Sequence, residues 1–169
     1  MPDQQQPHDL VIPDRMIDVL RSKKQTVAVA ESVTAGYLQT AFALAEFASE
    51  IFQGGITVYN LGQKVRHLSV EPIHALACNC VSESVSAQMA QNVAKSFSSD
   101  WGIGITGYAS PIPEKNIEEL YACYVIYFRD EEMIRHTVTA ETNSPANVMR
   151  YYAQKVIDHF LEVLTSKVL

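Results

Sequence analysis

Short apolar runs alternate with segments of helical periodicity along this chain, and this alternation restricts the fold more than any other feature of the sequence. The runs that predict strands are rich in β-branched residues or glycine, which suits buried positions in a sheet. They cover residues 26–30, 54–59 and 101–106. Helices are expected over residues 16–24, 37–46, 63–68, 71–77 and 82–98. Ser82 is well placed as the N-cap of the last of these helices.

The C-terminal part of the chain departs from this alternation. Residues 120–128 and 133–140 both have strand patterns, and only a short polar segment separates them, which predicts an antiparallel hairpin. A last helix is expected to begin near Pro145, a favoured residue in a first turn, and to end at about residue 166. We therefore predict an α/β fold, a three-layer α/β/α sandwich with a mixed, mostly parallel sheet of about five strands.

Composition excludes several classes of protein. Domains usually contain about 100–200 residues, so 169 residues predict one domain, placed at 14–169 behind a loosely ordered lead-in at 1–13. The net charge of −6, from 13 Lys and Arg against 19 Asp and Glu, argues against nucleic-acid and anionic-membrane partners. No apolar run approaches the ~18–20 residues that span a bilayer. The three cysteines do not form a disulfide framework, and free thiols suit a cytoplasmic location.

The loop after the first predicted strand is one candidate site. In sheets of this kind, ligands usually bind at loops beyond the carboxyl ends of the strands. Residues 31–36 bring the hydroxyls of Ser32 and Thr34, together with free N–H groups, to a helix N-terminus that can hold a phosphate or an oxyanion. The alternative is that Ser32 or Thr34 only caps that helix.

Two further loops also place reactive groups at strand ends. Lys64 follows the second predicted strand and can act as the general base for a serine if its pKa is lowered, with the Tyr59 hydroxyl as a proton relay. The alternative for Lys64 is an ordinary solvated side chain. Thr106 and Gly107 follow the third strand and suit either the close approach of a ligand or a plain turn.

In their order and spacing, these segments resemble the C-terminal domain of the CinA competence-damage-inducible family, which also occurs as a stand-alone nicotinamide-nucleotide amidase. The resemblance covers roughly residues 14–168. The matching residues are Ala30, Glu31, Ser32, Thr34, Gly36, Gly54, Gly55, Tyr59, Lys64, Val81, Ser82, Asp100, Thr106, Gly107, Ala109 and Pro111. Larger members carry an N-terminal pyrophosphatase-type domain, which we expect to be missing from these 169 residues.

The resemblance implies an amidohydrolase that converts nicotinamide mononucleotide to nicotinic acid mononucleotide and ammonia. It implies that Ser32 is the nucleophile, Lys64 the base and Tyr59 their partner, with no cofactor, no metal and a homo-oligomeric assembly. The expected contacts of the small nucleotide substrate are Glu31, Thr34, Gly36, Thr106, Gly107 and Arg150. Arg150, on the last helix, is the candidate for the phosphate, and the alternative for it is a surface arginine.

The sequence also departs from the family pattern. Ala35 stands where the family has glycine and adds a Cβ at a position that can require positive φ. The glycine-rich stretch after the third strand is replaced by residues 110–114, which end in Pro113 and Glu114. If that loop meets the phosphate, we expect Glu114 to repel it. Three hypotheses follow: an active amidase, a catalytically impaired relative that binds a ligand or acts as an oligomeric partner, and an amidase for another small amide.

Overall fold

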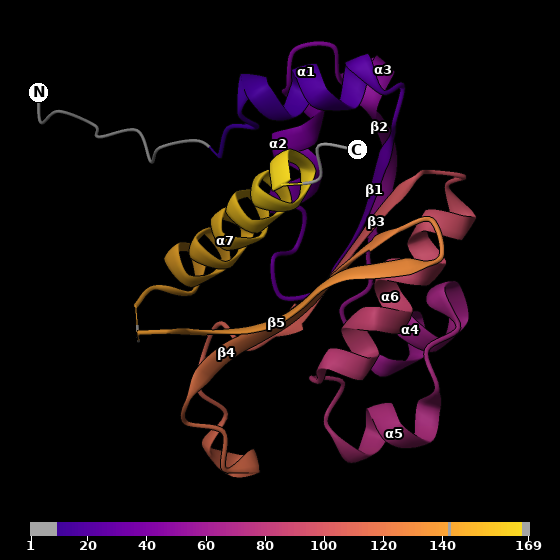
Figure 1. Ribbon diagram of the computed structural model, residues 1–169. Helices are drawn as coiled ribbons and strands as arrows, with labels where there is room; N and C mark the ends of the chain where they lie inside the picture. Colours follow the sequence, from indigo (N-terminus) through magenta and orange to yellow (C-terminus); the bar gives the residue numbers. More distant parts are fainter. Residues whose placement is uncertain (1–9, 142, 167–169) are drawn as a thin grey trace, which may run out of the picture.

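In the computed structural model, which describes residues 10–141 and 143–166, one sheet organises the chain (Figure 1). Its strands are β1 (Val27–Glu31), β2 (Phe52–Thr57), β3 (Trp101–Gly107), β4 (Leu120–Phe128) and β5 (Glu131–Ala140). Their order in the sheet is β2-β1-β3-β4-β5. β1 pairs in parallel with β2 and β3, whereas β4 is antiparallel to both β3 and β5. Only β4 therefore runs against the other described strands, which confirms the mixed, mostly parallel sheet.

Helices cover both faces of this sheet (Figure 1). One layer contains α1 (Asp14–Ser22), α2 (Tyr37–Ala43), α3 (Ala48–Ile51) and α7 (Pro145–Ser166). The other contains α4 (Leu61–Leu68), α5 (Pro72–Ala77) and α6 (Glu83–Ser96). Each layer has its own apolar core against the sheet, and the larger core lies under α1, α2 and α7. The predicted three-layer α/β/α sandwich is confirmed.

Close packing of α6 on β3 explains the alternating glycines of that strand. A Cβ added at Gly104 would overlap the carbonyl oxygen of Ser86, which belongs to the α6 backbone. The glycine therefore lets helix and strand approach more closely than a side chain would allow. This contact sets the distance between α6 and the sheet.

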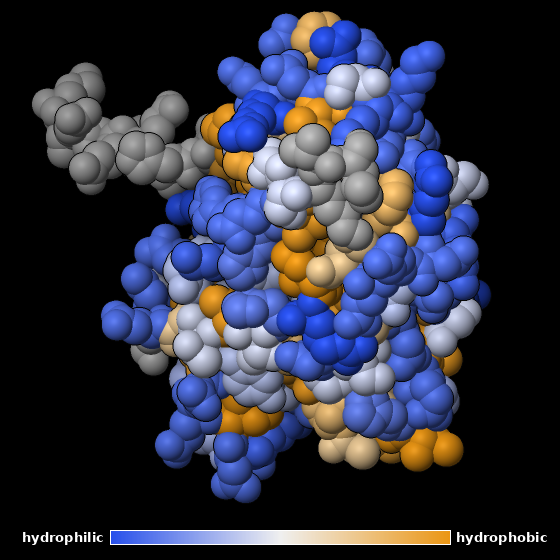
Figure 2. Space-filling model, viewed as in Figure 1, coloured by the Kyte–Doolittle hydropathy of each residue, from blue (hydrophilic) through white to orange (hydrophobic). Residues whose placement is uncertain are grey.

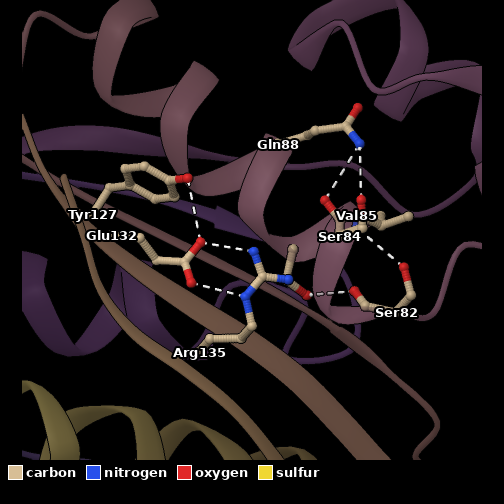
Figure 3. A network of polar contacts seen from close by, with 8 residues as sticks. Ser82, Ser84, Val85, Gln88, Tyr127, Glu132 and Arg135 are labelled. Atoms are coloured by element: carbon tan, nitrogen blue, oxygen red, sulfur yellow. Dashed lines mark hydrogen bonds and ion pairs between the residues drawn. The ribbon is translucent and has the colours of Figure 1, made fainter. Parts of the chain in front are cut away.

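Two sets of polar contacts lie close together, one in the β4–β5 hairpin and one at the start of α6 (Figure 3). Arg135 donates through Nε and Nη2 to the two carboxylate oxygens of Glu132, each at 2.8 Å, and the Tyr127 hydroxyl also donates to Glu132. Close by, the Ser82 hydroxyl accepts from the N–H group of Val85 at 3.1 Å and caps α6, which confirms the predicted N-cap. The first set ties β5 to β4 at the edge of the sheet, and the second fixes the start of α6.

Several element boundaries differ from the predictions, and three of the differences change how the chain is connected. The helix predicted over 37–46 ends at Ala43, and Phe47, with φ 58°, leads into the separate helix α3. Strand β2 begins at Phe52, before the glycine pair, and β5 begins at Glu131, so the hairpin turn is tighter than predicted. In the predicted lead-in, residues 1–9 lie outside the described residues. Ile12 is only 2% exposed and belongs to the core, so ordered packing begins before the predicted boundary at residue 14.

Within the described ranges, no helix has both the length and the apolar character needed to cross a membrane.

Candidate active site

Ser32 and Lys64 meet at the carboxyl end of β1. Ser32 is the first residue after β1, and Lys64 lies in α4, whose N-terminus is capped by Asn60. The Nζ atom of Lys64 lies 2.8 Å from Ser32 Oγ and also donates to the carbonyl oxygen of Val58 at 2.8 Å. The Val58 carbonyl thus orients the amine towards the serine hydroxyl, as a nucleophile–base pair requires.

Burial changes the protonation of Lys64. The side chain is fully buried, and no ion pair joins it to a carboxylate among the described residues. Loss of solvation of the charged form lowers the pKa of Lys64 to about 8, and the nearby Cys80 thiol opposes this shift. A substantial fraction of the amine is therefore neutral near pH 8 and can accept a proton from Ser32.

The loop after β1 is held by a buried carboxylate. Glu31 is fully buried and accepts hydrogen bonds from the N–H groups of Gly36, Leu38 and Gln39, at 3.2, 3.0 and 2.8 Å. These donors are the N-cap residue and two first-turn residues of α2, whose N–H groups have no partner within the helix, so Glu31 satisfies the start of that helix. The structure therefore gives Glu31 the capping role that we had considered for Ser32 or Thr34, and Glu31 does not line the cavity beside Ser32.

The same loop presents a free N–H group beside the nucleophile. The backbone N–H of Val33 has no hydrogen-bond partner among the described residues, and Val33 lines the cavity next to Ser32. An N–H at this position can donate to an oxyanion that forms on a carbonyl attacked by Ser32. Ala35 adopts φ 47° and Gly36 φ 107°, so the family glycine at position 35 is replaced without loss of the left-handed turn.

A cavity of about 610 Å³ opens beside the Ser32–Lys64 pair. Of the residues assigned from the sequence, it brings together Ser32, Tyr59, Lys64, Thr106 and Gly107. Its mouth is apolar: the side chains of Tyr59 and Leu76 are 72% and 71% exposed, and Figure 2 shows apolar surface gathered over α5. A cavity of this size accommodates a mononucleotide.

Thr106 lies at the floor of this cavity. Its side chain is buried, and its hydroxyl donates to the carbonyl oxygen of Cys80 at 2.8 Å. The bond ties the end of β3 to the loop that follows α5. A substrate contact by this hydroxyl therefore has to use its lone pairs, because the proton is engaged.

The structure does not bring the remaining assigned residues to this cavity. Gly36 and Arg150 line a separate cavity of about 230 Å³, where the Arg150 guanidinium lies 5.7 Å from the centre of the Tyr37 ring. Thr34 is fully buried, and its hydroxyl has no hydrogen-bond partner among the described residues. The geometry therefore gives no support to Arg150 as the phosphate contact of the larger cavity.

The loop that departs from the family pattern forms one wall of the cavity. Residues Pro113–Lys115 form a short 3-10 turn, closed by an isolated bridge between Ile112 and Ile117. Ser110, Ile112 and Lys115 line the cavity, whereas Glu114 is exposed and does not. The repulsion expected from Glu114 therefore has no structural basis. Lys115 is not among the residues assigned from the sequence, although its place in the same loop was the available signal.

Metal ligands do not gather in the described part of the chain, where no group of three or more His, Cys, Asp or Glu side chains could hold an ion. The fold and the cavity define a one-sheet α/β/α domain with a buried serine–lysine pair at the carboxyl end of its first strand. The chain belongs to the CinA family, since the model of the CinA C-terminal domain matches residues 10–164.

Curated relatives agree with this assignment. A CinA-like protein from Picosynechococcus sp. is 34% identical over 135 residues, which cover 79% of this chain and 32% of that protein. A CinA-like protein from Rippkaea orientalis is 42% identical over 93 residues, covering 55% of this chain and 22% of that protein. The matched region thus spans about a third or less of these curated relatives.

Two crystal structures share the fold. A competence or damage-inducible protein from Enterobacter asburiae superposes with a TM-score of 0.83 at 24% identity, covering 89% of this chain and 94% of that chain. A CinA superfamily protein from Enterobacter cloacae gives a TM-score of 0.85 at 20% identity, with coverage of 97% and 98%. At these identities the likeness establishes the architecture alone.

Proposed function

We propose that this chain is an amidohydrolase that deamidates nicotinamide mononucleotide to nicotinic acid mononucleotide and ammonia. One observation carries the proposal: Lys64, buried and with a pKa lowered to about 8, contacts Ser32 Oγ at 2.8 Å beside a cavity of about 610 Å³. The family membership and the resemblance of the loops support the choice of substrate.

The chemistry proceeds through an ester of Ser32. Neutral Lys64 accepts the hydroxyl proton while Oγ attacks the carboxamide carbon, and the N–H of Val33 stabilises the resulting oxyanion. Collapse of this intermediate breaks the C–N bond, and protonated Lys64 gives its proton to the leaving ammonia. Water then attacks the ester, with Lys64 again as the base, and releases the carboxylate product and free Ser32.

Tyr59 contributes at the mouth of the site. Its ring lines the cavity and its side chain is largely exposed, so its hydroxyl is free to approach a bound carboxamide. We assign it the relay of a proton between Lys64 and the leaving group, with Thr106 and Gly107 as contacts of the substrate at the floor. Cytoplasmic location and homo-oligomeric assembly belong to the same proposal, and light scattering on the purified protein measures the assembly.

A second candidate function follows from the altered loop. Residues 110–115 have lost the family's glycines, yet they still wall the cavity beside Ser32 and Lys64. A relative that binds the nucleotide without hydrolysing it would keep the cavity but would not catalyse amide hydrolysis. The two functions differ in one measurable quantity, the release of ammonia.

The test is an assay of ammonia and nicotinic acid mononucleotide from purified protein and nicotinamide mononucleotide. Ser32→Ala and Lys64→Met remove the nucleophile and the base, and each is expected to lower kcat by about 100-fold or more. Matched controls are Ser84→Ala and Lys95→Met, exposed positions on α6 that lie outside the cavity. Ammonia release by the wild type that does not exceed that of Ser32→Ala, with nucleotide binding retained, selects the binding function instead.

A further inference from the structure

The charge of the cavity is opposite to that of the chain. The sequence carries a net charge of −6, yet the charged side chains that line the cavity are Lys64 and Lys115, with no carboxylate among the lining residues. Lys64 is fully buried and committed to Ser32 and Val58. Lys115 is exposed and has no place in the proposed chemistry, so its function needs a separate explanation.

A hydrogen-bonded chain holds Lys115 in position. Its Nζ atom donates to Asn79 Oδ1 at 2.8 Å, and Asn79 Nδ2 donates to the Tyr108 hydroxyl at 3.1 Å. Because an ammonium group can only donate, the amide oxygen of Asn79 must face Lys115, and the amide nitrogen must then face Tyr108. Asn79 thereby connects the loop after α5 with two positions in the segment after β3.

This arrangement leaves two of the three N–H donors of the Lys115 ammonium group without a protein partner among the described residues. One of its three N–H donors is used by Asn79, and the described residues place no carboxylate within ion-pair distance of Lys115. A cation that is held by an amide and not neutralised by an acid keeps its full charge available to a ligand. Phosphate oxygens are suitable acceptors for such a group.

We infer that Lys115, positioned by Asn79, is the anion-binding residue of this cavity and receives the phosphate of the substrate while its carboxamide lies at Ser32. The inference rests on the proposed function for the identity of the ligand, a phosphomonoester of a nucleoside amide. Lys115 thereby replaces Arg150 as the expected contact of the phosphate, since Arg150 lines a different cavity.

The Cys80 thiol lies close enough to both lysines to feel the charge of each. Burial raises the pKa of Cys80, while the positive charges of Lys64 and Lys115 both act to lower it. Cys80 itself lines the cavity. Both cations therefore lie near Cys80 in the lining of one cavity, Lys64 buried and Lys115 exposed.

This placement makes Lys115 a determinant of specificity. A nucleotide and its nucleoside share the carboxamide that meets Ser32, and they differ in the phosphate that meets Lys115. A single exposed charge-assisted contact is worth on the order of tenfold in affinity. The cavity should therefore prefer nicotinamide mononucleotide over nicotinamide riboside by that factor, and the preference should depend on Lys115.

The test measures equilibrium binding of both compounds by calorimetry in the Ser32→Ala background, where no turnover interferes. Adding Lys115→Met is expected to weaken binding of the mononucleotide about tenfold and to leave the riboside unchanged. Adding Lys95→Met, the matched control, is expected to change neither. Asn79→Leu should reproduce the direction of the Lys115→Met effect, and Lys115→Arg should restore the preference for the phosphate.

Two outcomes overturn the inference: a Lys115→Met protein that still prefers the mononucleotide as strongly as its parent, and one that loses affinity for both compounds equally. The amidase proposal is judged separately by ammonia release from the wild type. If the wild type releases no ammonia but its preference for the mononucleotide depends on Lys115, the anion site at Lys115 is supported and the amidase proposal is contradicted.

Discussion

The Nζ atom of Lys64 lies 2.8 Å from the Oγ atom of Ser32, although 32 positions separate the two residues in the sequence. The contact exists because Ser32 directly follows β1 and Lys64 lies one turn into the helix that follows the neighbouring strand β2. Parallel pairing brings the carboxyl ends of β1 and β2 to one edge of the sheet, and both side chains turn into the same cavity.

We expect the rate to follow the ionisation of Lys64. Because only the neutral amine accepts the proton of Ser32, kcat/KM should rise with pH and level off above an apparent pKa of about 8. The measurement is a pH profile of ammonia release for the wild type, with Lys95→Met as the control that keeps the profile. A flat profile from about pH 6 to about pH 9 would contradict Lys64 as the base.

Replacing Lys64 should stabilise the fold while it removes activity. The pKa of about 8 lies below the ordinary value of 10.5, so at neutral pH the folded state bears a charge that burial disfavours. The penalty is about 3 kcal/mol; Lys64→Met removes it but also loses the hydrogen bond to the Val58 carbonyl, which costs about 1 kcal/mol, so a smaller net gain in stability remains. Urea denaturation at pH 7 measures the gain, and a loss of stability in Lys64→Met would contradict the cause assigned to the shift.

The destabilisation caused by the buried charge of Lys64 should also make the free energy of unfolding depend on pH. Between about pH 8 and about pH 10.5 the unfolded chain binds more protons at Lys64 than the folded one, so this residue adds stability as the pH rises. Burial also raises the pKa values of Tyr124 and Tyr152. The contribution of these tyrosines to stability falls at high pH, equally in the wild type and in Lys64→Met. The difference in the free energy of unfolding between the wild type and Lys64→Met, measured by urea denaturation at each pH, should therefore decrease from about pH 8 to about pH 10.5.

Glu31→Gln should loosen the loop that carries Ser32. The amide has one acceptor oxygen where the carboxylate offers two, so it cannot accept from all three N–H groups and presents its own donors to them. We expect a loss of about 1–3 kcal/mol in the free energy of unfolding, measured by urea denaturation. Glu46→Gln, an exposed position, is the control, and equal stability of the two variants would contradict the capping role.

Gly104→Ala should destabilise the contact between α6 and β3. The added methyl group would overlap the Ser86 carbonyl in the α6 backbone, which cannot move without shifting the helix. Overpacking of this kind costs about 1–3 kcal/mol. Gly62→Ala is the matched control, because its Cβ would meet nothing closer than 3.5 Å and helices favour alanine. Thermal unfolding should show a lower Tm for Gly104→Ala and an equal or higher Tm for Gly62→Ala.

The sequence by itself determined the succession of most strands and helices along the chain and, from it, the sandwich, because these depend on the spacing of apolar residues among near neighbours. It also determined the Ser82 cap, which depends on the residue type at the start of one helix. It also singled out Ser32, Tyr59 and Lys64, because they lie at or near the ends of predicted strands and match the motifs of the CinA family. It did not reveal that Glu31 is a buried cap, because a carboxylate in a loop has the same pattern whether it faces a ligand or the protein's own N–H groups.

Only the tertiary structure decided which groups share the cavity. Arg150 and Lys115 are both basic residues distant from Ser32 in the sequence, yet one lines a separate cavity and the other lies on the wall beside the serine. The depressed pKa of Lys64 has the same origin, because it comes from burial beneath segments remote along the chain. Local periodicity encodes the elements, whereas packing of distant segments sets burial, and with it the charge and shape of the site.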